Sequence, residues 1–592
     1  MSIKSLYPDT RPSLNLDFAN TKVLDPRVTF ARASTATYYD GKTTHKAEEN
    51  LALYSQTFTD PYWAKFGVSI TANSTTAPDG TLTASTLTAT NDSYQQYLQA
   101  FTGLDISDTM TYSVYLKAGT KDNVRIYAYN NSAFYANFDL TNGVVTANGG
   151  TDSYSITNVG NGWYRCSITG TKTHDSQYKL VIYGQNGNFY IWGAQFEQRS
   201  SLTAYTPTTS SPITRYAPTL LTAPTNSPRF DHNPTTGESL GLLIEEQRTN
   251  LWLQSSNFTA SDGPVYANWN FASIFANTAI APDGTLTADT FYGSSPTASI
   301  VTRFSATAGV TYTFSIYLKK DPTSNNANLN YFGFIVCWSN NGTTLTGYDF
   351  PNLVSGQNTS DVLTNEWKRF SVSYTCPSGA TSMEFGISNR GSGLGSQNYS
   401  VLCWGAQIES GPFPTSYTPT TGSQVTRSAD SASMTGTNFS SWYTEGEGTL
   451  YAEQIVGNID AARSNQTAAL LYLNTSNLIG IGQAVGWGGT SGSLANMWIH
   501  SNNSIQIING TANFLNVGDT LKSAGAYTFN DAAFSGNTQP LLTDNTVIVP
   551  TGLNQLLIGN GYPGYYSNGW IKKISYYPKR LPNSQLQALT QP

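Results

Sequence analysis

The side chains best suited to covalent chemistry in this chain are carboxylates, because glycoside hydrolysis needs two of them about 5–10 Å apart around a sugar ring. Glu245 and Glu246 are neighbours in a strand-like run, so their side chains point to opposite faces. Glu445 and Glu447 precede another strand-like run, and their spacing lets them share a face. Solvated loops and salt bridges account for acids of this kind more simply. We therefore expect no catalytic residues, and keep a polysaccharide depolymerase with accessory binding modules as the alternative.

Metal and phosphate chemistry have no signal in the sequence. The four histidines are far apart and match no metal-ligand spacing: His45, His174, His232 and His500. The sequence contains neither a Gly-x-Ser-x-Gly nucleophile motif nor a Gly-x-x-x-x-Gly-Lys-Ser/Thr phosphate loop. We therefore expect no metal ion and no cofactor.

Aromatic residues carry a stronger signal, with 37 Tyr, 26 Phe and 12 Trp. Aromatic rings stack on the C–H faces of sugars, and Asn, Gln and Asp side chains fix a sugar's orientation. Rings without a counterpart in the repeat described below are the better candidates for such contacts. Tyr127 and Tyr129 share one face of a predicted strand, and Trp338 lies beside a predicted inserted loop. The first choice is a Gly/Pro loop that cannot easily bury its three tyrosines: Tyr562, Tyr565 and Tyr566. Subunit packing explains such a loop as well as ligand binding does.

An internal repeat supplies the elements that position these residues. The string Ala-Pro-Asp-Gly-Thr-Leu-Thr-Ala occurs at Ala77–Ala84 and again at Ala281–Ala288. Trp-Gly-Ala-Gln follows in each copy, at Trp192 and Trp404, and a Tyr-Thr-Pro-Thr-Thr tail comes after it. Two long segments are therefore copies of one module. Three tryptophan pairs recur in step, and we expect them to pack the shared core: Trp63 with Trp269, Trp163 with Trp367, and Trp192 with Trp404.

Short alternating runs separated by turn residues predict an all-β chain of several domains. The Pro-Asp-Gly of each copy is a turn signal. The second module is eight residues longer between the repeated strings, and we place the extra loop around Asn340–Gly347. The predicted divisions are an N-terminal anchoring arm with short strands (1–49), a first jelly-roll module (50–212), a Pro-rich connector (213–249), a second jelly-roll module (250–424) and a C-terminal sandwich (425–592).

Composition excludes two classes of partner. Charged residues make up 11% of the chain and the net charge is −6, whereas nucleic-acid binding needs a basic stripe. No run of about 18 apolar residues occurs, so we expect no membrane insertion. The N-terminal segment has no apolar signal-peptide core, and three of the four cysteines, Cys166, Cys337 and Cys403, sit in strand-like runs, while Cys376 precedes Pro377 at a predicted turn. These features predict synthesis in a reducing cytoplasm without a signal peptide.

The C-terminal part resembles a known lectin fold. A Leu-x-Ile-Gly strand (Leu556–Gly559), a Gly-rich loop and a final Gly569-Trp-Ile run ending in Tyr577 are similar to the closing strands of concanavalin A-like, laminin-G-like sandwiches. The two repeated modules resemble carbohydrate-binding jelly rolls, through their opening Asn-Leu, the Ala-Pro-Asp-Gly-Thr turn and the closing Trp-Gly-Ala-Gln. The resemblances imply two tandem jelly-roll β-sandwiches followed by a concanavalin A-like β-sandwich.

The arrangement as a whole resembles bacteriophage virion proteins of the tail-fibre or surface-appendage kind. The residues that carry this resemblance are Arg27–Ser34 (Arg-Val-Thr-Phe-Ala-Arg-Ala-Ser) and Gly241–Leu251 (Gly-Leu-Leu-Ile-Glu-Glu-Gln-Arg-Thr-Asn-Leu). The resemblance implies a virion location, other virion proteins and host cell-surface glycans as partners, and a homotrimer by analogy. The alternative within that setting is head decoration or a fibre scaffold without glycan binding. We expect the arm to anchor the chain and the terminal domain to point outward.

Overall fold

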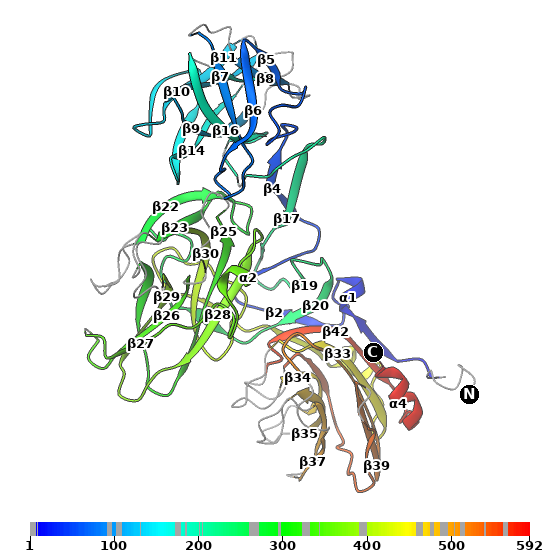
Figure 1. Cartoon of the computed structure of the whole chain (residues 1–592). Helices are drawn as coiled ribbons and strands as arrows, with labels where there is room; N and C mark the ends of the chain where they lie inside the picture. The colour runs from blue at the N-terminus through cyan, green and yellow to red at the C-terminus, as the bar shows by residue number, and fades with distance from the viewer. Residues whose placement is uncertain are drawn as a thin grey trace.

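A computed structural model describes residues 8–591, except 9, 92–96, 102–108, 131, 172–178, 184–185, 201, 204, 260–271, 294–297, 322–328, 330–331, 343, 390–398, 458–465, 474–478, 486–494, 502–503, 510–514, 538–539 and 561–565. The chain is almost entirely β and forms three two-sheet sandwiches (Figure 1). This confirms the expected fold class. None of the helices in the described residues is long and apolar enough to span a membrane.

The first module is a sandwich of two six-stranded antiparallel sheets. We call one the front sheet; in spatial order its strands are β12 (Val144–Gly149), β11 (Ser132–Asp139), β10 (Asn123–Asn130), β15 (Lys179–Tyr183), β8 (Tyr97–Phe101) and β5 (Ala64–Phe66). The other contains β13 (Ser153–Gly160), β14 (Trp163–Thr171), β9 (Thr109–Ala118), β16 (Gly187–Glu197), β7 (Ala84–Ala89) and β6 (Val68–Thr75). Alternate residues of both sheets fill one apolar core, as the period of a strand requires.

The second module has the same plan, with fewer strands in its described residues. Its larger sheet contains β22 (Ala272–Ala279), β23 (Ala288–Gly293), β30 (Tyr399–Ser410), β25 (Thr311–Lys320) and β28 (Lys368–Thr375). Its smaller sheet contains β24 (Ser299–Ser305), β29 (Ser382–Asn389), β26 (Phe332–Ser339) and β27 (Gly347–Asp349). The short helix α2 (Thr359–Val362) precedes β28. The order β27-β26-β29-β24 corresponds to β11-β10-β15-β8 of the first module.

The third sandwich is the largest. One sheet contains β19 (Phe230–His232), β20 (Ser239–Ile244), β42 (Gly569–Tyr577), β33 (Gly448–Ile455), β38 (Thr520–Thr528), β39 (Asp531–Gly536) and β40 (Leu542–Asp544), with β1 (Leu14–Asp17) also on β42. The other contains β2 (Thr29–Ala31), β32 (Ser431–Thr435), β41 (Gln555–Ile558), β34 (Gln466–Leu473), β35 (Ile479–Val485), β36 (Ala495–Ser501) and β37 (Ser504–Asn509). Helix α4 (Asn583–Leu589) packs on the outer face of β38 and β39, α1 (Phe18–Thr21) contacts β20 and β42, and α3 (Thr437–Ser440) contacts β32.

Three two-stranded ribbons link the sandwiches. They pair β4 (Thr44–Asn50) with β17 (Ile213–Pro218), β3 (Ala36–Tyr38) with β18 (Leu221–Ala223), and β21 (Arg248–Asn250) with β31 (Val425–Arg427). The segments that lead into and out of each module therefore pair as two antiparallel strands, so each junction consists of two strands and not of a single linker. All four cysteines are free and buried.

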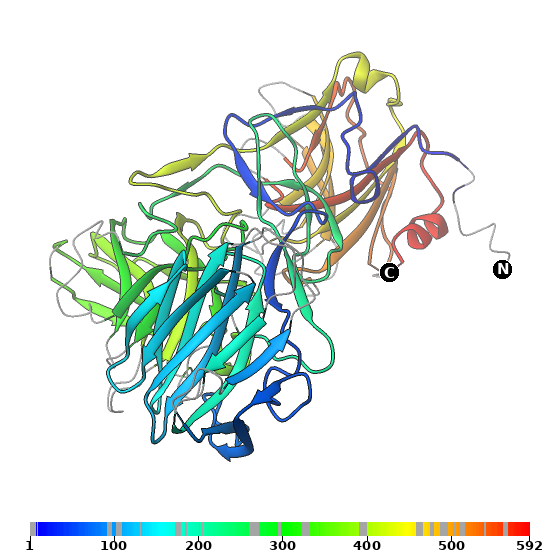
Figure 2. The same ribbon diagram turned by 90° about the horizontal axis from the view of Figure 1, so that it is seen from above.

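The structure corrects the expected arm and connector, because both contribute strands to the third sandwich. Strand β1 pairs with β42, with Leu14 opposite Tyr576, and β2 pairs with β32. The connector supplies β20, in which Leu242 lies opposite Ile571. Leu14, Leu242 and Ile571 are all fully buried in the same core. The third sandwich is thus built from three separate stretches of chain, and the arm does not lie at the opposite end of the molecule from the terminal domain (Figures 1 and 2).

Candidate functional site

The repeated motifs close each module. The side chain of Asn50 donates to the carbonyls of Ala194 (2.9 Å) and Thr206 (2.8 Å) and accepts from the backbone N–H groups of Ala52 (3.0 Å) and Phe196 (3.2 Å). Asn250 makes the same four bonds in the second module, to Ala406, Thr418, Trp252 and Ile408. This buried amide joins the first residues of each module to its last strand and tail.

The recurring tryptophans belong to this closing framework, as predicted. Trp63, Trp163, Trp192 and Trp404 are buried, and Trp367 is partly buried. The indole N–H of Trp192 donates a hydrogen bond to the hydroxyl of Thr83, and that of Trp404 donates to the hydroxyl of Thr287, each with a length of 3.0 Å. Both threonines belong to the repeated turn string. Trp269 lies outside the described residues.

An outward row of aromatic side chains crosses the front sheet of the first module. The inward residues of these strands, such as Leu98, Ile126 and Ile182, fill the core, so the alternate positions face away from it. Phe66 of β5 lies opposite Tyr97 of β8, and Tyr97 lies opposite Tyr183 of β15. We call this line of directly opposed residues the upper row; it continues through Arg125 of β10 and Asn137 of β11.

A second line of outward residues, the lower row, runs beside it. Tyr127 of β10 lies opposite Tyr135 of β11 on one side and Val181 of β15 on the other. Val181 lies opposite Gln99, which lies opposite Ala64 at the sheet edge. Five strands spaced about 4.8 Å apart give each row a length of about 19 Å. This length suits a chain-like ligand.

The rings of the two rows contact one another. Phe66 stacks on Tyr97 with centroids 4.6 Å apart, and Tyr97 meets Tyr183 edge to face at 5.8 Å. Tyr183 meets Tyr127 edge to face at 5.7 Å, and Tyr127 stacks on Tyr135 at 6.3 Å. Phe66 is 43% exposed, and the other four rings are half-buried. Mutual packing holds these rings in place while part of each remains accessible.

Polar groups lie within the same face. The Arg125 guanidinium lies over the Tyr135 ring, 4.4 Å from its centroid, and its Nε donates to Asn137 Oδ1 over 2.6 Å. Gly149 of β12 lies opposite Tyr135, and a Cβ there would come within 2.8 Å of the tyrosine ring. The missing side chain at Gly149 therefore leaves space for the ring. Rings beside amide and guanidinium groups are the combination that a sugar-binding surface uses.

The structure brings only part of the predicted site together. Tyr127 belongs to the lower row. Tyr129 is on the same strand as Tyr127, and its backbone lies opposite Ala133 of β11 on one side and Lys179 of β15 on the other. Sequence reasoning missed Phe66, Tyr97, Tyr135 and Tyr183, because their proximity depends on the pairing of strands distant in sequence.

The remaining predicted residues lie elsewhere. Trp338 packs on the second module's core and stacks on Tyr374 at 5.6 Å, so its ring is directed inward. Tyr566 is partly buried against the third sandwich's core, and burial raises the pKa of its hydroxyl. Tyr562 and Tyr565 lie outside the described residues.

The corresponding face of the second module is covered by the loop between its own strands β26 and β27. Leu345 and Phe350 pack on Val301, Ile335 and Cys337, which are the outward residues of the smaller sheet. Arg303 pairs with Glu384 at 2.9 Å and donates to the Gly342 carbonyl of the inserted loop at 2.7 Å. Burial and the neighbouring Glu384 raise the pKa of the Cys337 thiol to about 12. The loop around Asn340–Gly347 therefore packs on the face that corresponds to the front sheet of the first module, but it is not the expected eight-residue insertion, since the extra residues lie between Trp367 and Trp404.

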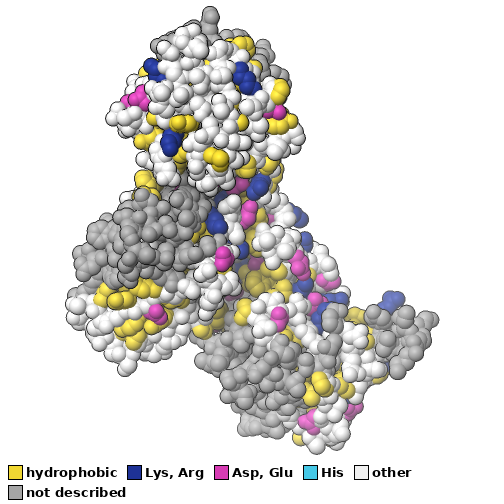
Figure 3. Space-filling view, viewed as in Figure 1, with side chains coloured by type: hydrophobic (Ala, Val, Ile, Leu, Met, Phe, Trp, Pro, Cys, Tyr) yellow, Lys and Arg dark blue, Asp and Glu magenta, His cyan; other side chains and the backbone are white. Residues whose placement is uncertain are grey.

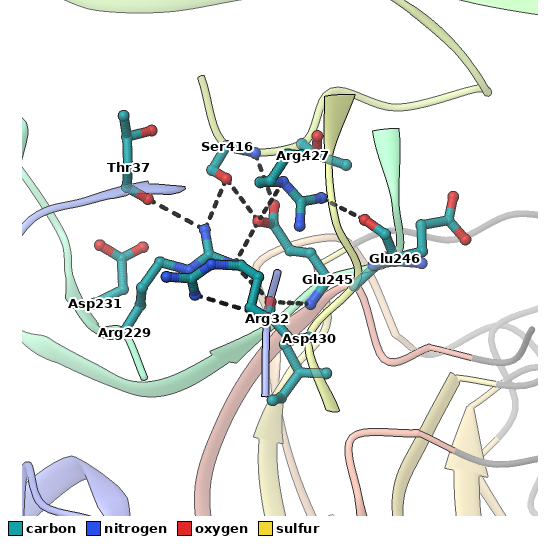
Figure 4. Close-up of polar contacts among 12 residues, drawn as sticks. Arg32, Thr37, Arg229, Asp231, Glu245, Glu246, Ser416, Arg427 and Asp430 are labelled. Carbon is teal, nitrogen blue, oxygen red and sulfur yellow. Dashed lines mark hydrogen bonds and ion pairs between the residues drawn. The ribbon is translucent and has the colours of Figure 1, made fainter. Parts of the chain in front are cut away.

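A buried ionic cluster joins the second module to the third sandwich (Figure 4). Asp430 pairs with Arg32 at 3.1 Å and with Arg229 at 2.6 Å, and all three side chains are fully buried. Arg229 also pairs with Glu245 at 2.8 Å, and Arg427 lies 3.7 Å from Glu245. The partners come from the arm, the connector and the segment after the second module. This cluster therefore ties three distant parts of the chain together.

The acidic residues considered for catalysis have structural partners. Glu245 accepts from the backbone N–H and hydroxyl of Ser416, both over 2.7 Å. Burial raises its pKa, but Arg427 and Arg229 outweigh this effect and lower the pKa to about 2. Glu246 pairs with Arg248. The Glu445 carboxylate accepts a 2.8 Å hydrogen bond from the backbone N–H of Gly552, and the Glu447 carboxylate accepts a 3.3 Å hydrogen bond from the backbone N–H of Arg580.

Where Figure 3 colours the side chains by type, charged ones are scattered among a majority of uncharged ones. Among the described residues, no group of three or more His, Cys, Asp and Glu side chains is arranged to hold a metal ion.

The sequence matches no protein-family profile and no curated relative. Domain 4 of an extracellular GH43 arabinanase from Geobacillus stearothermophilus, solved with arabinotriose, is 12% identical with a TM-score of 0.22, over 28% of this chain and 73% of that one. The N-terminal CBM22-1–CBM22-2 tandem domain of Paenibacillus barcinonensis Xyn10C is 10% identical with a TM-score of 0.21, over 62% and 99%. A heptameric pentraxin from Limulus polyphemus is 13% identical with a TM-score of 0.19, over 24% and 68%. Likenesses at such TM-scores carry no argument about function.

Proposed function

We propose that this protein is a non-catalytic glycan-binding protein, and that the two rows on the front sheet of its first module are the binding face. The observation that carries the proposal is the register that aligns Phe66, Tyr97 and Tyr183 on three adjacent strands. Partly accessible rings in a line provide stacking surfaces for successive sugars, and the partly exposed Asn137 provides a polar group for sugar hydroxyls, whereas Gln99 is buried (6% exposed).

Mutual packing of the rings favours binding energetically. A ligand that meets preformed rings does not have to order them, so less of the contact energy is lost to conformational entropy. The length of about 19 Å favours an oligosaccharide or a polysaccharide segment over a monosaccharide.

The setting that we propose is a bacteriophage particle, in which the chain is a tail-fibre or surface-appendage component that contacts host glycans and other virion proteins. Its support is the sequence resemblance, together with paired-strand junctions that hold the modules in a fixed frame. Trimerisation and a virion location belong to the same proposal. Mass spectrometry of purified particles should detect the chain as a constituent. Its absence would overturn the virion setting without affecting glycan binding.

The binding face is tested by titrating the full chain with oligosaccharides selected from a glycan array. Tyr183 belongs to the upper row, and its ring contacts both Tyr97 and Tyr127. Its replacement by alanine should weaken binding at least about tenfold, which corresponds to about 1.4 kcal/mol. Tyr154→Ala is the matched control, because Tyr154 is an exposed tyrosine (47%) on the opposite sheet of the same module. Unchanged affinity in Tyr183→Ala, or an equal loss in both variants, would overturn the assignment of the face.

A second measurement, the release of reducing ends, distinguishes glycan binding from the depolymerase alternative. Incubation with each bound polysaccharide should release no reducing ends, because the four candidate glutamates are engaged in structural hydrogen bonds and ion pairs. Release that is lost in Glu445→Gln or Glu447→Gln would favour the enzyme instead.

A further inference from the structure

The two rows contain a single charged residue in their described positions, and it is a cation. Arg125 stands in the upper row between Tyr183 and Asn137. The chain as a whole carries a net charge of −6, so a positive group within this face runs against the general trend of the sequence. Asp139 lies two residues beyond Asn137 on β11. Its carboxylate accepts hydrogen bonds from the backbone N–H of Thr141 and from the backbone and side chain of Asn142.

Two contacts hold the Arg125 guanidinium in a defined position. Its Nε donates to Asn137 Oδ1 over 2.6 Å, and its Cζ lies over the Tyr135 ring at 4.4 Å from the centroid. The Tyr135 ring in turn lies in the space that Gly149 leaves open. A guanidinium held by a ring and an amide needs little further ordering when a ligand arrives.

The chemistry of a guanidinium distinguishes between sugars. It has five N–H donors and no acceptor, and its fork matches the two oxygens of a carboxylate. A neutral sugar offers only single hydroxyl oxygens to the same group. The sugar class that complements a line of rings followed by a guanidinium is therefore one whose pyranose rings carry carboxylates.

We propose that this face prefers uronic-acid-containing glycans to neutral ones, with rings stacked along Phe66, Tyr97 and Tyr183 and a carboxylate at Arg125. This inference rests on the proposed function and adds the class of ligand. Asn137 acts as a positioning residue, since it contacts the guanidinium through the Arg125 Nε.

The test compares ligands that differ only in charge. Oligogalacturonate, oligoglucuronate and oligomannuronate are each titrated into the full chain beside their methyl esters, which keep the sugar and lose the carboxylate charge. For at least one pair, the wild-type chain should bind the acid at least about tenfold more tightly than the ester. The difference should decrease at high salt, because the contact is partly exposed.

Arg125→Gln should bring the affinities for acid and ester together while ester binding remains, because the rings are retained. Arg125→Lys should recover only part of the preference, since an ammonium cannot form the two parallel bonds. Circular dichroism checks that both variants fold. Asn137→Ala should weaken binding of the acid more than binding of the ester and so reduce the preference, whereas a general loss of folding would weaken both equally.

The outcomes separate the two proposals. Equal binding of acid and ester by the wild-type chain, a preference that survives in Arg125→Gln, or binding of neutral glycans alone would overturn the uronate preference and leave glycan binding intact. No binding of any glycan would overturn the proposed function itself.

Discussion

At the scale of single residues, the binding face depends on side chains that hold one another in place. Tyr135 illustrates this, because its ring contacts Tyr127 and Arg125 and lies beside Gly149. The sequence places Tyr127 on an outward strand face by simple alternation. It cannot show that Tyr183 and Phe66 share that face, since Phe66 pairs with Tyr97, 31 residues away, and Tyr183 pairs with Arg125, 58 residues away.

Gly149→Ala tests whether ring position matters without removing a ring. The new Cβ would lie 2.8 Å from the Tyr135 ring, so the ring should move and glycan affinity should decrease about threefold or more. The flexible ring can yield, so the free energy of unfolding should change by less than about 1 kcal/mol. Gly536→Ala is the matched strand control, because its nearest neighbours would be at 3.6 Å. Unaltered affinity in Gly149→Ala, measured by calorimetry, would contradict this role of Tyr135.

The lowered pKa of Glu245 predicts how low pH affects the stability of the buried ionic cluster between the second module and the third sandwich. The folded-state pKa of about 2 is below the ordinary value of 4.5, so the unfolded chain binds this proton more readily. The associated stabilisation is therefore complete above about pH 4.5 and is lost as the pH falls toward 2. Glu245→Gln should lower the free energy of unfolding by about 3–5 kcal/mol at pH 7, and by about 2 kcal/mol less at pH 3.

Urea titrations at the two pH values measure this difference. Glu238→Gln is the control, because Glu238 is largely exposed (63%) in its pair with Lys572 and should contribute less than about 1 kcal/mol. A cost of Glu245→Gln that is the same at pH 7 and pH 3 would contradict the assigned ionic role.

At the scale of elements, the two modules differ where the sequence repeat breaks down. The repeated strings form the closing framework in both copies, which explains why their residues changed little between copies. The eight extra residues do not lie around Asn340–Gly347 as expected, because Trp367 follows the repeated turn string at the same interval as Trp163, and the whole difference falls between Trp367 and Trp404. The loop between β26 and β27 nevertheless covers the outward face of its sheet, where Leu345 packs. The repeat thus predicted the paired tryptophans well, but the sequence alone did not show that the loop folds back onto its own sheet.

Asn250→Ala tests the closing framework. The variant would leave two carbonyls and two backbone N–H groups of the second module without their buried partner. We expect the module to lose at least about 3 kcal/mol of its free energy of unfolding, measured by urea unfolding of the fragment 250–424. Asn257→Ala is the control, since Asn257 is exposed and serves only a local turn at Thr259. Equal stabilities of the two variants would refute the closing role.

At the scale of the whole molecule, the first module stands away from the third sandwich, which contains strands from both ends of the described chain (Figure 1). The ribbon of β4 and β17 connects the first module to the second, where Lys319 pairs with Glu48 at 3.3 Å and Leu220 donates to the Pro282 carbonyl. The short strands expected in the arm are present, whereas the segment expected to be a Pro-rich connector also contains strands. Their partners, about 330 to 560 residues away, cannot be found from local sequence patterns.

Fragments test this discontinuous architecture. Residues 425–592 alone lack β1, β2 and β20 and would expose a core that Leu14, Leu16 and Leu242 normally fill. We expect this fragment to give a poorly dispersed NMR spectrum, whereas 50–212, which contains its complete core, should fold alone. A well-dispersed spectrum from 425–592 would show that the arm and connector are dispensable.

The central claim is that the two rows of the first module bind glycan chains. The most direct measurement is the position of an oligosaccharide bound to the full chain, determined by crystallography or electron cryomicroscopy. We expect sugar rings stacked along Phe66, Tyr97 and Tyr183, crossing the strands of the front sheet. Density over the Tyr566 region of the third sandwich, with the front sheet empty at saturating ligand, would contradict the claim.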